Sequence, residues 1–80
     1  MKRDKFLITL NGKEEFVKSK WNTSIRFIEG YVRTIAKKNN EMFRLVGSFS
    51  NKNLDGFYVS GVREWKGDIG TKLLFVIEKV

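Results

Sequence analysis

One stretch of this 80-residue chain has the apolar spacing of a helix, and it decides what the rest can fold into. Apolar residues recur there at i, i+3, i+7 and i+10, and with two neighbours they form an arc of about 140°. The polar residues 22–24 can cap a helix start, and Asn39 and Asn40 can end a helix in a left-handed conformation. We therefore predict one helix over residues 24–38. Its apolar arc consists of Ile25, Ile28, Tyr31, Val32, Ile35 and Ala36.

The segments before this helix have the pattern of a β-hairpin. Residues 6–10 are apolar and partly β-branched, Asn-Gly follows at 11–12, and residues 13–18 make a return strand with few apolar side chains. A two-residue turn would pair Leu7 with Phe16. We favour a three-residue bulged turn that pairs Phe6 with Phe16, because it places Phe6, Ile8 and Phe16 on one face.

The segments after the helix are strands separated by a less regular region. Residues 42–46 alternate as a strand, residues 57–59 make a short strand, and residues 47–70 otherwise carry turn signals. Residues 72–80 are apolar on both faces, which indicates either a central strand or a strand with one face that is a binding surface. The chain is thus predicted to be a single α+β domain over residues 1–80. We expect the order ββαβ(β)β, with a mixed sheet packed on one helix and a crossover that makes two strands parallel.

The composition excludes several classes of function. The chain has no Cys and no His, so it lacks thiolate ligands, imidazole ligands and the commonest general base. Its nine acidic residues are scattered. We therefore expect no enzyme activity, no cofactor and no metal site.

The sequence also predicts a location. No apolar run reaches the roughly 18–20 residues needed to span a bilayer, and residues 6–10 are too short for the core of a signal peptide. We expect an intracellular, cytoplasmic protein that does not bind membranes.

Four segments, taken in order, resemble the ubiquitin-like β-grasp family. Ile8-Thr9-Leu10-Asn11-Gly12-Lys13 is similar to the first hairpin turn of that family, and Thr23-Ser24-Ile25-Arg26-Phe27-Ile28 to its helix start. Phe43-Arg44-Leu45-Val46-Gly47 resembles the third strand. Gly67-Asp68-Ile69-Gly70-Thr71-Lys72-Leu73-Leu74-Phe75-Val76 resembles the closing turn and last strand. The resemblance implies a β-grasp fold and binding of proteins through the exposed sheet face.

The same resemblance implies a non-conjugating adaptor. Conjugated members end in Gly-Gly, whereas this sequence ends Glu78-Lys79-Val80. Leu10, Arg44 and Val76 map by position to the apolar patch of ubiquitin, with Arg44 in place of an apolar residue. Leu74 alternates with the residues that should face the helix, so we predict an interaction surface centred on Arg44, Leu74 and Val76 with Leu10 at its rim.

The net charge of +7 supports an alternative function, the binding of nucleic acid. Arg26, Arg33 and Lys37 cluster on the polar side of the predicted helix and could follow phosphates or an acidic protein. Trp21, Tyr58 and Trp65 could stack on bases, or could form a small core under the irregular region. We expect the partner to be a protein, with nucleic acid as second choice, and the chain itself to be a monomer or a weak homodimer.

Overall fold

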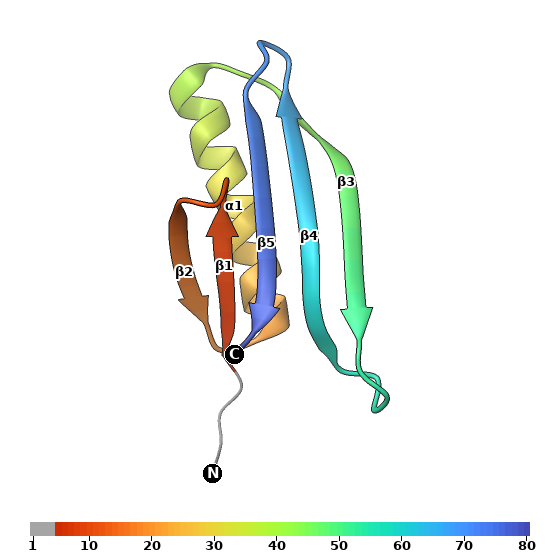
Figure 1. Ribbon diagram of the computed structural model, residues 1–80. Coiled ribbons are helices and arrows are strands. Elements are labelled where there is room, and N and C mark those ends of the chain that lie inside the picture. The colour runs from red at the N-terminus through yellow and green to blue at the C-terminus, as the bar shows by residue number, and fades with distance from the viewer. Residues whose placement is uncertain (1–4) are drawn as a thin grey trace.

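The computed structural model describes residues 5–80; residues 1–4 of the predicted 1–80 domain lie outside the described part. One helix lies against a five-stranded sheet, which confirms the predicted α+β class (Figure 1). The molecule is elongated, 44 × 20 × 20 Å. Its elements are β1 (Phe6–Leu10), β2 (Glu14–Lys18), α1 (Trp21–Asn39), β3 (Phe43–Lys52), β4 (Tyr58–Gly67) and β5 (Lys72–Lys79).

The strand order is β2-β1-β5-β4-β3, and every pairing is antiparallel. The prediction of a mixed sheet was therefore wrong. The helix does return the chain so that β2 and β3 run in the same direction (Figure 1). These two strands lie at opposite edges of the sheet, however, with three strands between them. Because β1, β5 and β4 alternate in direction across that gap, no parallel pair forms.

The core lies between the helix and the middle strands. Phe6, Ile8 and Leu10 of β1 alternate inward. They pack with alternate residues of β5 and with the buried side of α1. β5 pairs with both β1 and β4, which confirms the prediction of a central strand. The other buried apolar residues are Ile28, Val32, Leu73, Phe75 and Ile77.

The first hairpin has the predicted face and a different register. Asn11 and Gly12 both have positive φ, and the three-residue turn joins the strands at Leu10 and Glu14. Phe16 consequently pairs with Ile8 and not with Phe6. A shift of two residues keeps a side chain on the same face, so Phe16 still packs against the core.

The helix begins three residues earlier than the capping pattern predicted. Ser24 is buried inside the first turn, where its hydroxyl donates to the Lys20 carbonyl at 2.8 Å. No side chain caps the start at Lys20. Instead Trp21 is held by an edge contact with Phe6 and a stack on Tyr58, so tertiary packing fixes the first turn. The helix ends as predicted, at Asn40 in the left-handed conformation.

The region predicted to be irregular is a long hairpin. β3 and β4 have ten residues each and are paired along their length, with bulges after Leu45 and Asn51. The Asn53 side chain accepts from the amides of Asp55 and Phe57, which closes the turn between the strands. This hairpin extends the sheet beyond the helix, which packs on β1, β2, β4 and β5 (Figure 1).

Candidate functional site

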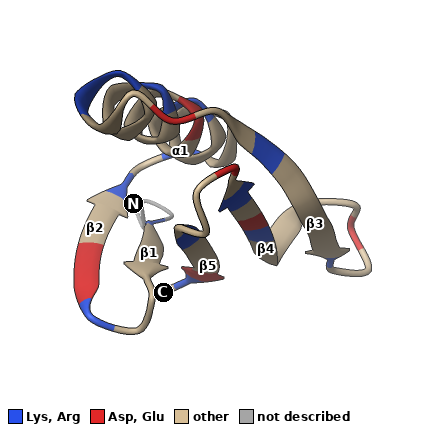
Figure 2. Cartoon of the chain, turned by 90° about the horizontal axis from the view of Figure 1, so that it is seen from above, with Lys and Arg blue, Asp and Glu red and all other residues tan. Residues whose placement is uncertain are grey.

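The helix covers one side of the sheet and leaves the other side open (Figure 2). Leu73, Phe75 and Ile77 of β5 point into the core, so the residues between them emerge on the open face. Cross-strand pairing then defines which side chains accompany them, because directly paired residues share a face. The open face is therefore determined strand by strand from the register.

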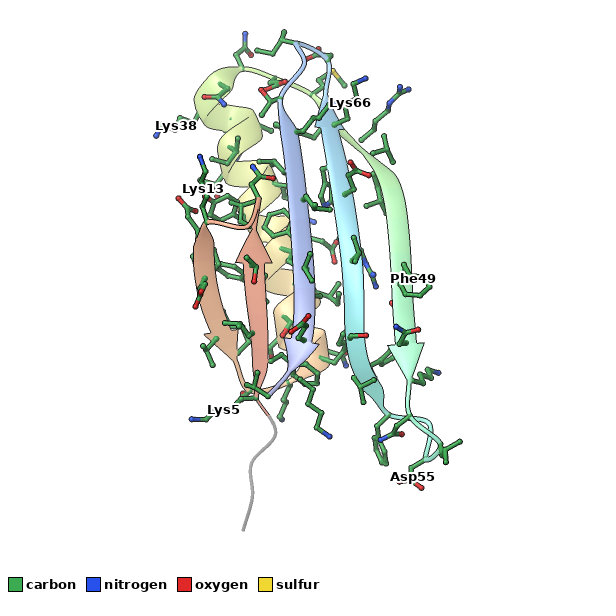
Figure 3. All side chains as sticks on the ribbon, in the orientation of Figure 1. Lys5, Lys13, Lys38, Phe49, Asp55 and Lys66 are labelled. Atoms are coloured by element: carbon green, nitrogen blue, oxygen red, sulfur yellow. The ribbon has the colours of Figure 1, made fainter. Side chains whose placement is uncertain are left out.

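An apolar row crosses three strands of this face and ends beside Thr9 of β1. Val76 of β5 pairs with Thr9 of β1 on one side and with Val62 of β4 on the other. Val62 in turn pairs with Phe49 of β3. Phe49 is 57% exposed, and Figure 3 shows it on the outer strand, at the edge of the sheet. Leu74, two residues from Val76 on the same face, is 38% exposed. We call Phe49, Val62, Leu74 and Val76 the apolar row.

A second row, of three cations, crosses the same face nearer the β4–β5 turn. Arg44 of β3 pairs with Lys66 of β4, and Lys66 pairs with Lys72 of β5. Figure 3 shows Lys66 at this end of the sheet. All three residues are exposed. We call them the basic row.

The like charges of the basic row destabilise the folded state. Like charges directly opposite each other on a sheet are destabilising, by roughly 0.2–1 kcal/mol per pair. Within residues 5–80, the structure records no ion pair or hydrogen bond for these three side chains. Glu64 shares the face, but its carboxylate lies over Gly47, where an added Cβ would stand 3.3 Å from Oε1. The fold therefore leaves three cations in a line without acidic partners.

The predicted interaction residues are only partly brought together. Leu74 and Val76 share the open face, as expected from alternation, and Arg44 lies on the same face. Arg44 is on the edge strand at the end of the sheet, and not at the centre of the patch. Leu10 must be removed from the set, because it points toward the helix and is buried in the core. In β1 the open-face positions are Leu7 and Thr9.

The predicted basic side of the helix exists as a solvent-exposed surface. Arg26, Arg33 and Lys37 are all exposed on α1, on the other side of the sheet from the basic row. The molecule therefore has two separate groups of three cations, one on each of its broad sides.

The aromatic residues proposed as stacking platforms are occupied by the protein itself. Trp21 and Tyr58 stack with centroids 4.6 Å apart and planes 10° apart. Lys52 lies 4.8 Å from the centre of the Tyr58 ring, and Arg63 lies 5.8 Å from that of Trp21. Trp65 packs against the core, and its buried Nε1 has no partner among the described residues. These contacts favour the small-core interpretation over base stacking.

Glu41 is a key residue that the sequence reasoning missed. It is 3% exposed, and its Oε2 accepts from the amides of Ile69 and Thr71 at 3.3 Å each. Next to Glu41, the Met42 amide donates a hydrogen bond to Asp68 Oδ1, and the Asp68 amide donates one to the Met42 carbonyl. The start of β3 is thus attached to the β4–β5 turn, which holds Arg44 at the end of the sheet. No local signal distinguishes Glu41 from a solvated glutamate.

The remaining members of both rows were missed for one reason. Phe49, Val62 and Lys66 belong to the long hairpin, which the sequence reasoning treated as irregular. The turn signal at residues 53–56, with strand-length segments on both sides, could have revealed this hairpin.

One titratable group in the hairpin–helix contact is perturbed. Burial, the hydrogen bond from the Tyr31 hydroxyl to Glu14 Oε2 at 3.0 Å, and the Glu14 charge all raise the pKa of Tyr31 above its ordinary 10.0. In the described part of the chain, no group of three or more carboxylates is placed to hold a metal ion.

Comparisons of this chain with protein-family models, with curated proteins and with solved structures found no match. Among residues 5–80, no helix combines the length and the apolar character that crossing a membrane requires.

Proposed function

We propose that this protein is a non-catalytic interaction module that binds a protein partner through the open face of its sheet. The observation that carries the proposal is the apolar row, which continues across β3, β4 and β5 on the side that the helix leaves uncovered, with Phe49 and Leu74 exposed and Val62 and Val76 half-buried. The open face of an antiparallel sheet is usually polar. Contiguous exposed apolar side chains on such a face mark an interaction surface.

The proposal does not depend on kinship with ubiquitin-like proteins. The fold predicted alongside that resemblance had a mixed sheet, whereas the observed strand pairing is antiparallel throughout. What carries over is the general expectation of a small adaptor acting inside the cell through a sheet face. The absence of Cys and His from the sequence agrees with a role that needs neither nucleophile nor imidazole.

Leu74→Asp is the variant that tests the proposal. The side chain is on the open face, and a carboxylate there would be desolvated by any apolar partner. Leu54→Asp is the matched control, because Leu54 is fully exposed at the tip of the β3–β4 hairpin. Each variant would be immobilised beside the wild type and exposed to an extract of the source cells. We expect a partner retained by the wild type and by Leu54→Asp, and lost from Leu74→Asp.

Two control measurements test whether the loss of the partner has another cause. Circular dichroism melting must show that Leu74→Asp remains folded, which its position outside the core leads us to expect. Gel filtration of the wild type then distinguishes a foreign partner from a second copy of the chain. Equal retention of the partner by both variants would refute the open face as the binding surface.

Nucleic acid binding is the second candidate, and the net charge of +7 is what favours it. The wild type would be titrated with mixed-sequence single-stranded oligonucleotides at two salt concentrations fourfold apart. Neutralising four phosphates should weaken binding by about fiftyfold over that interval. A steep loss of this kind would replace the protein-binding proposal, whereas weak and flat binding would exclude the second candidate.

A further inference from the structure

The basic row has a structural setting that the apolar row does not explain. Beside it lies a cavity of about 490 Å³ at the end of the sheet, lined by Met42, Phe43, Arg44, Lys66, Gly67 and Asp68. Two of the three cations of the row thus form part of the cavity wall. Met42 is 78% exposed there, so an apolar side chain stands beside the charges.

The position of the row also limits how its charge could be neutralised internally. Its three members are fixed in adjacent strands by the register, and the Glu41 contact holds the start of β3 in place. No acidic residue pairs with them in the described part of the chain. A ligand that brings negative charge would remove the repulsion between these three cations. Its binding would therefore stabilise the folded state.

We propose that the basic row is the recognition site for an acidic segment of the protein partner, whose carboxylates lie over Arg44, Lys66 and Lys72. This inference rests on the proposed function and adds the chemistry of the partner. An apolar side chain flanking the acidic residues would enter the cavity beside Met42 and Phe43. The segment would therefore combine carboxylates with at least one apolar residue.

The surroundings of the row favour a protein over a nucleic acid. Asp68 lines the cavity and Glu64 shares the sheet face, and both would repel a continuous phosphate backbone. A peptide can place neutral residues opposite these acids. On β5 the next side chain along the face is the aliphatic Leu74, and the faces of Trp21 and Tyr58 that meet in their stack are not open to bases.

Two triple variants test the inference with matched charge. Replacing Arg44, Lys66 and Lys72 by Gln removes three positive charges, so the formal net charge falls from +7 to +4. Replacing Arg26, Arg33 and Lys37 by Gln on the helix causes the same change of net charge on the other side of the molecule. The probe is a short fluorescein-labelled peptide of alternating glutamate and leucine, and binding is followed by fluorescence anisotropy at about 0.15 M salt, where the Debye length is about 8 Å.

We expect the row variant to lose at least about tenfold in affinity for this peptide, because three contacting charges are removed. The helix variant should change by no more than about twofold, since charges beyond a Debye length are screened. Equal losses in the two variants would overturn the inference and show a response to net charge alone. Failure of the wild type to bind the probe would also overturn it. So would tighter, row-dependent binding of an oligonucleotide of equal charge.

The partner assay separates this inference from the proposed function. If the row variant retains the protein partner as fully as the wild type, the partner is not recognised by the row, and only this inference fails. If Leu74→Asp retains the partner, the proposed function fails instead. Melting curves of both triple variants provide the control for folding, and removal of the like-charge pairs should not lower the stability of the row variant.

Discussion

Gly67 and Glu41 offer the sharpest test of how the end of the sheet is built. The Glu41 carboxylate lies directly over Gly67, and a Cβ added at that position would overlap its Oε2. Gly67 is buried, and its φ is not among the positive values, so alanine is excluded by the carboxylate and not by the backbone. Gly67→Ala therefore forces the Glu41 side chain out of its site.

The cost follows from the two hydrogen bonds that this displacement breaks. Each amide-to-carboxylate bond is charge-assisted and contributes about 1.5–3 kcal/mol, and the 3.3 Å lengths place both near the lower limit. We expect Gly67→Ala to lower the free energy of unfolding by about 3 kcal/mol. For a domain of this size, that corresponds to a fall in Tm of about 12–24 °C.

The decisive measurement is a double-mutant cycle by urea denaturation. In a Glu41→Ala background the space above Gly67 is empty, so Gly67→Ala should cost nothing, or should stabilise the fold by about 0.4–1 kcal/mol through chain entropy. The coupling energy is then about 3 kcal/mol or slightly more. If Gly67→Ala costs the same with and without the Glu41 carboxylate, the proposed contact does not hold the sheet end.

A glycine elsewhere in the chain provides the control of opposite sign. Gly30 lies in α1, and a Cβ added there would have no neighbouring atom within 4 Å. Alanine is the better helix former, so Gly30→Ala should raise the free energy of unfolding by about 0.5–1 kcal/mol. A loss at both glycines would indicate that alanine substitution is harmful for a reason unrelated to Glu41.

Two further predictions concern the helix contacts. Because the pKa of Tyr31 is raised in the folded state, its contribution to stability should be complete below pH 10.0 and decline as the pH rises through the folded pKa. Ultraviolet titration of the Tyr58→Phe variant, which leaves Tyr31 as the one tyrosine, should show this raised pKa, and adding Glu14→Gln should lower it. Gly61→Ala should displace Trp21, whose Cη2 would lie 2.6 Å from the new Cβ, at a cost of about 1–3 kcal/mol. Unchanged tryptophan fluorescence and unchanged stability would contradict that contact.

Several elements were predictable because their signals are local. The apolar spacing indicated the helix, Asn11 and Gly12 indicated the first hairpin, and alternation in residues 72–80 separated the two faces of β5. Each signal operates within a few residues along the chain. The helix start was misplaced because Trp21 is held by Phe6 and Tyr58, which are distant in sequence.

The sequence by itself determined the helix, the first hairpin and the last strand, and which side of β5 faces the core. Tertiary structure alone decided the antiparallel order of the sheet, the burial of Leu10 and Glu41, and the alignment of Arg44, Lys66 and Lys72 in one row. The reason is physical: periodicity acts between near neighbours, whereas a row across a sheet depends on the register between strands. That register is set by turns, bulges and core packing that join residues far apart in the chain.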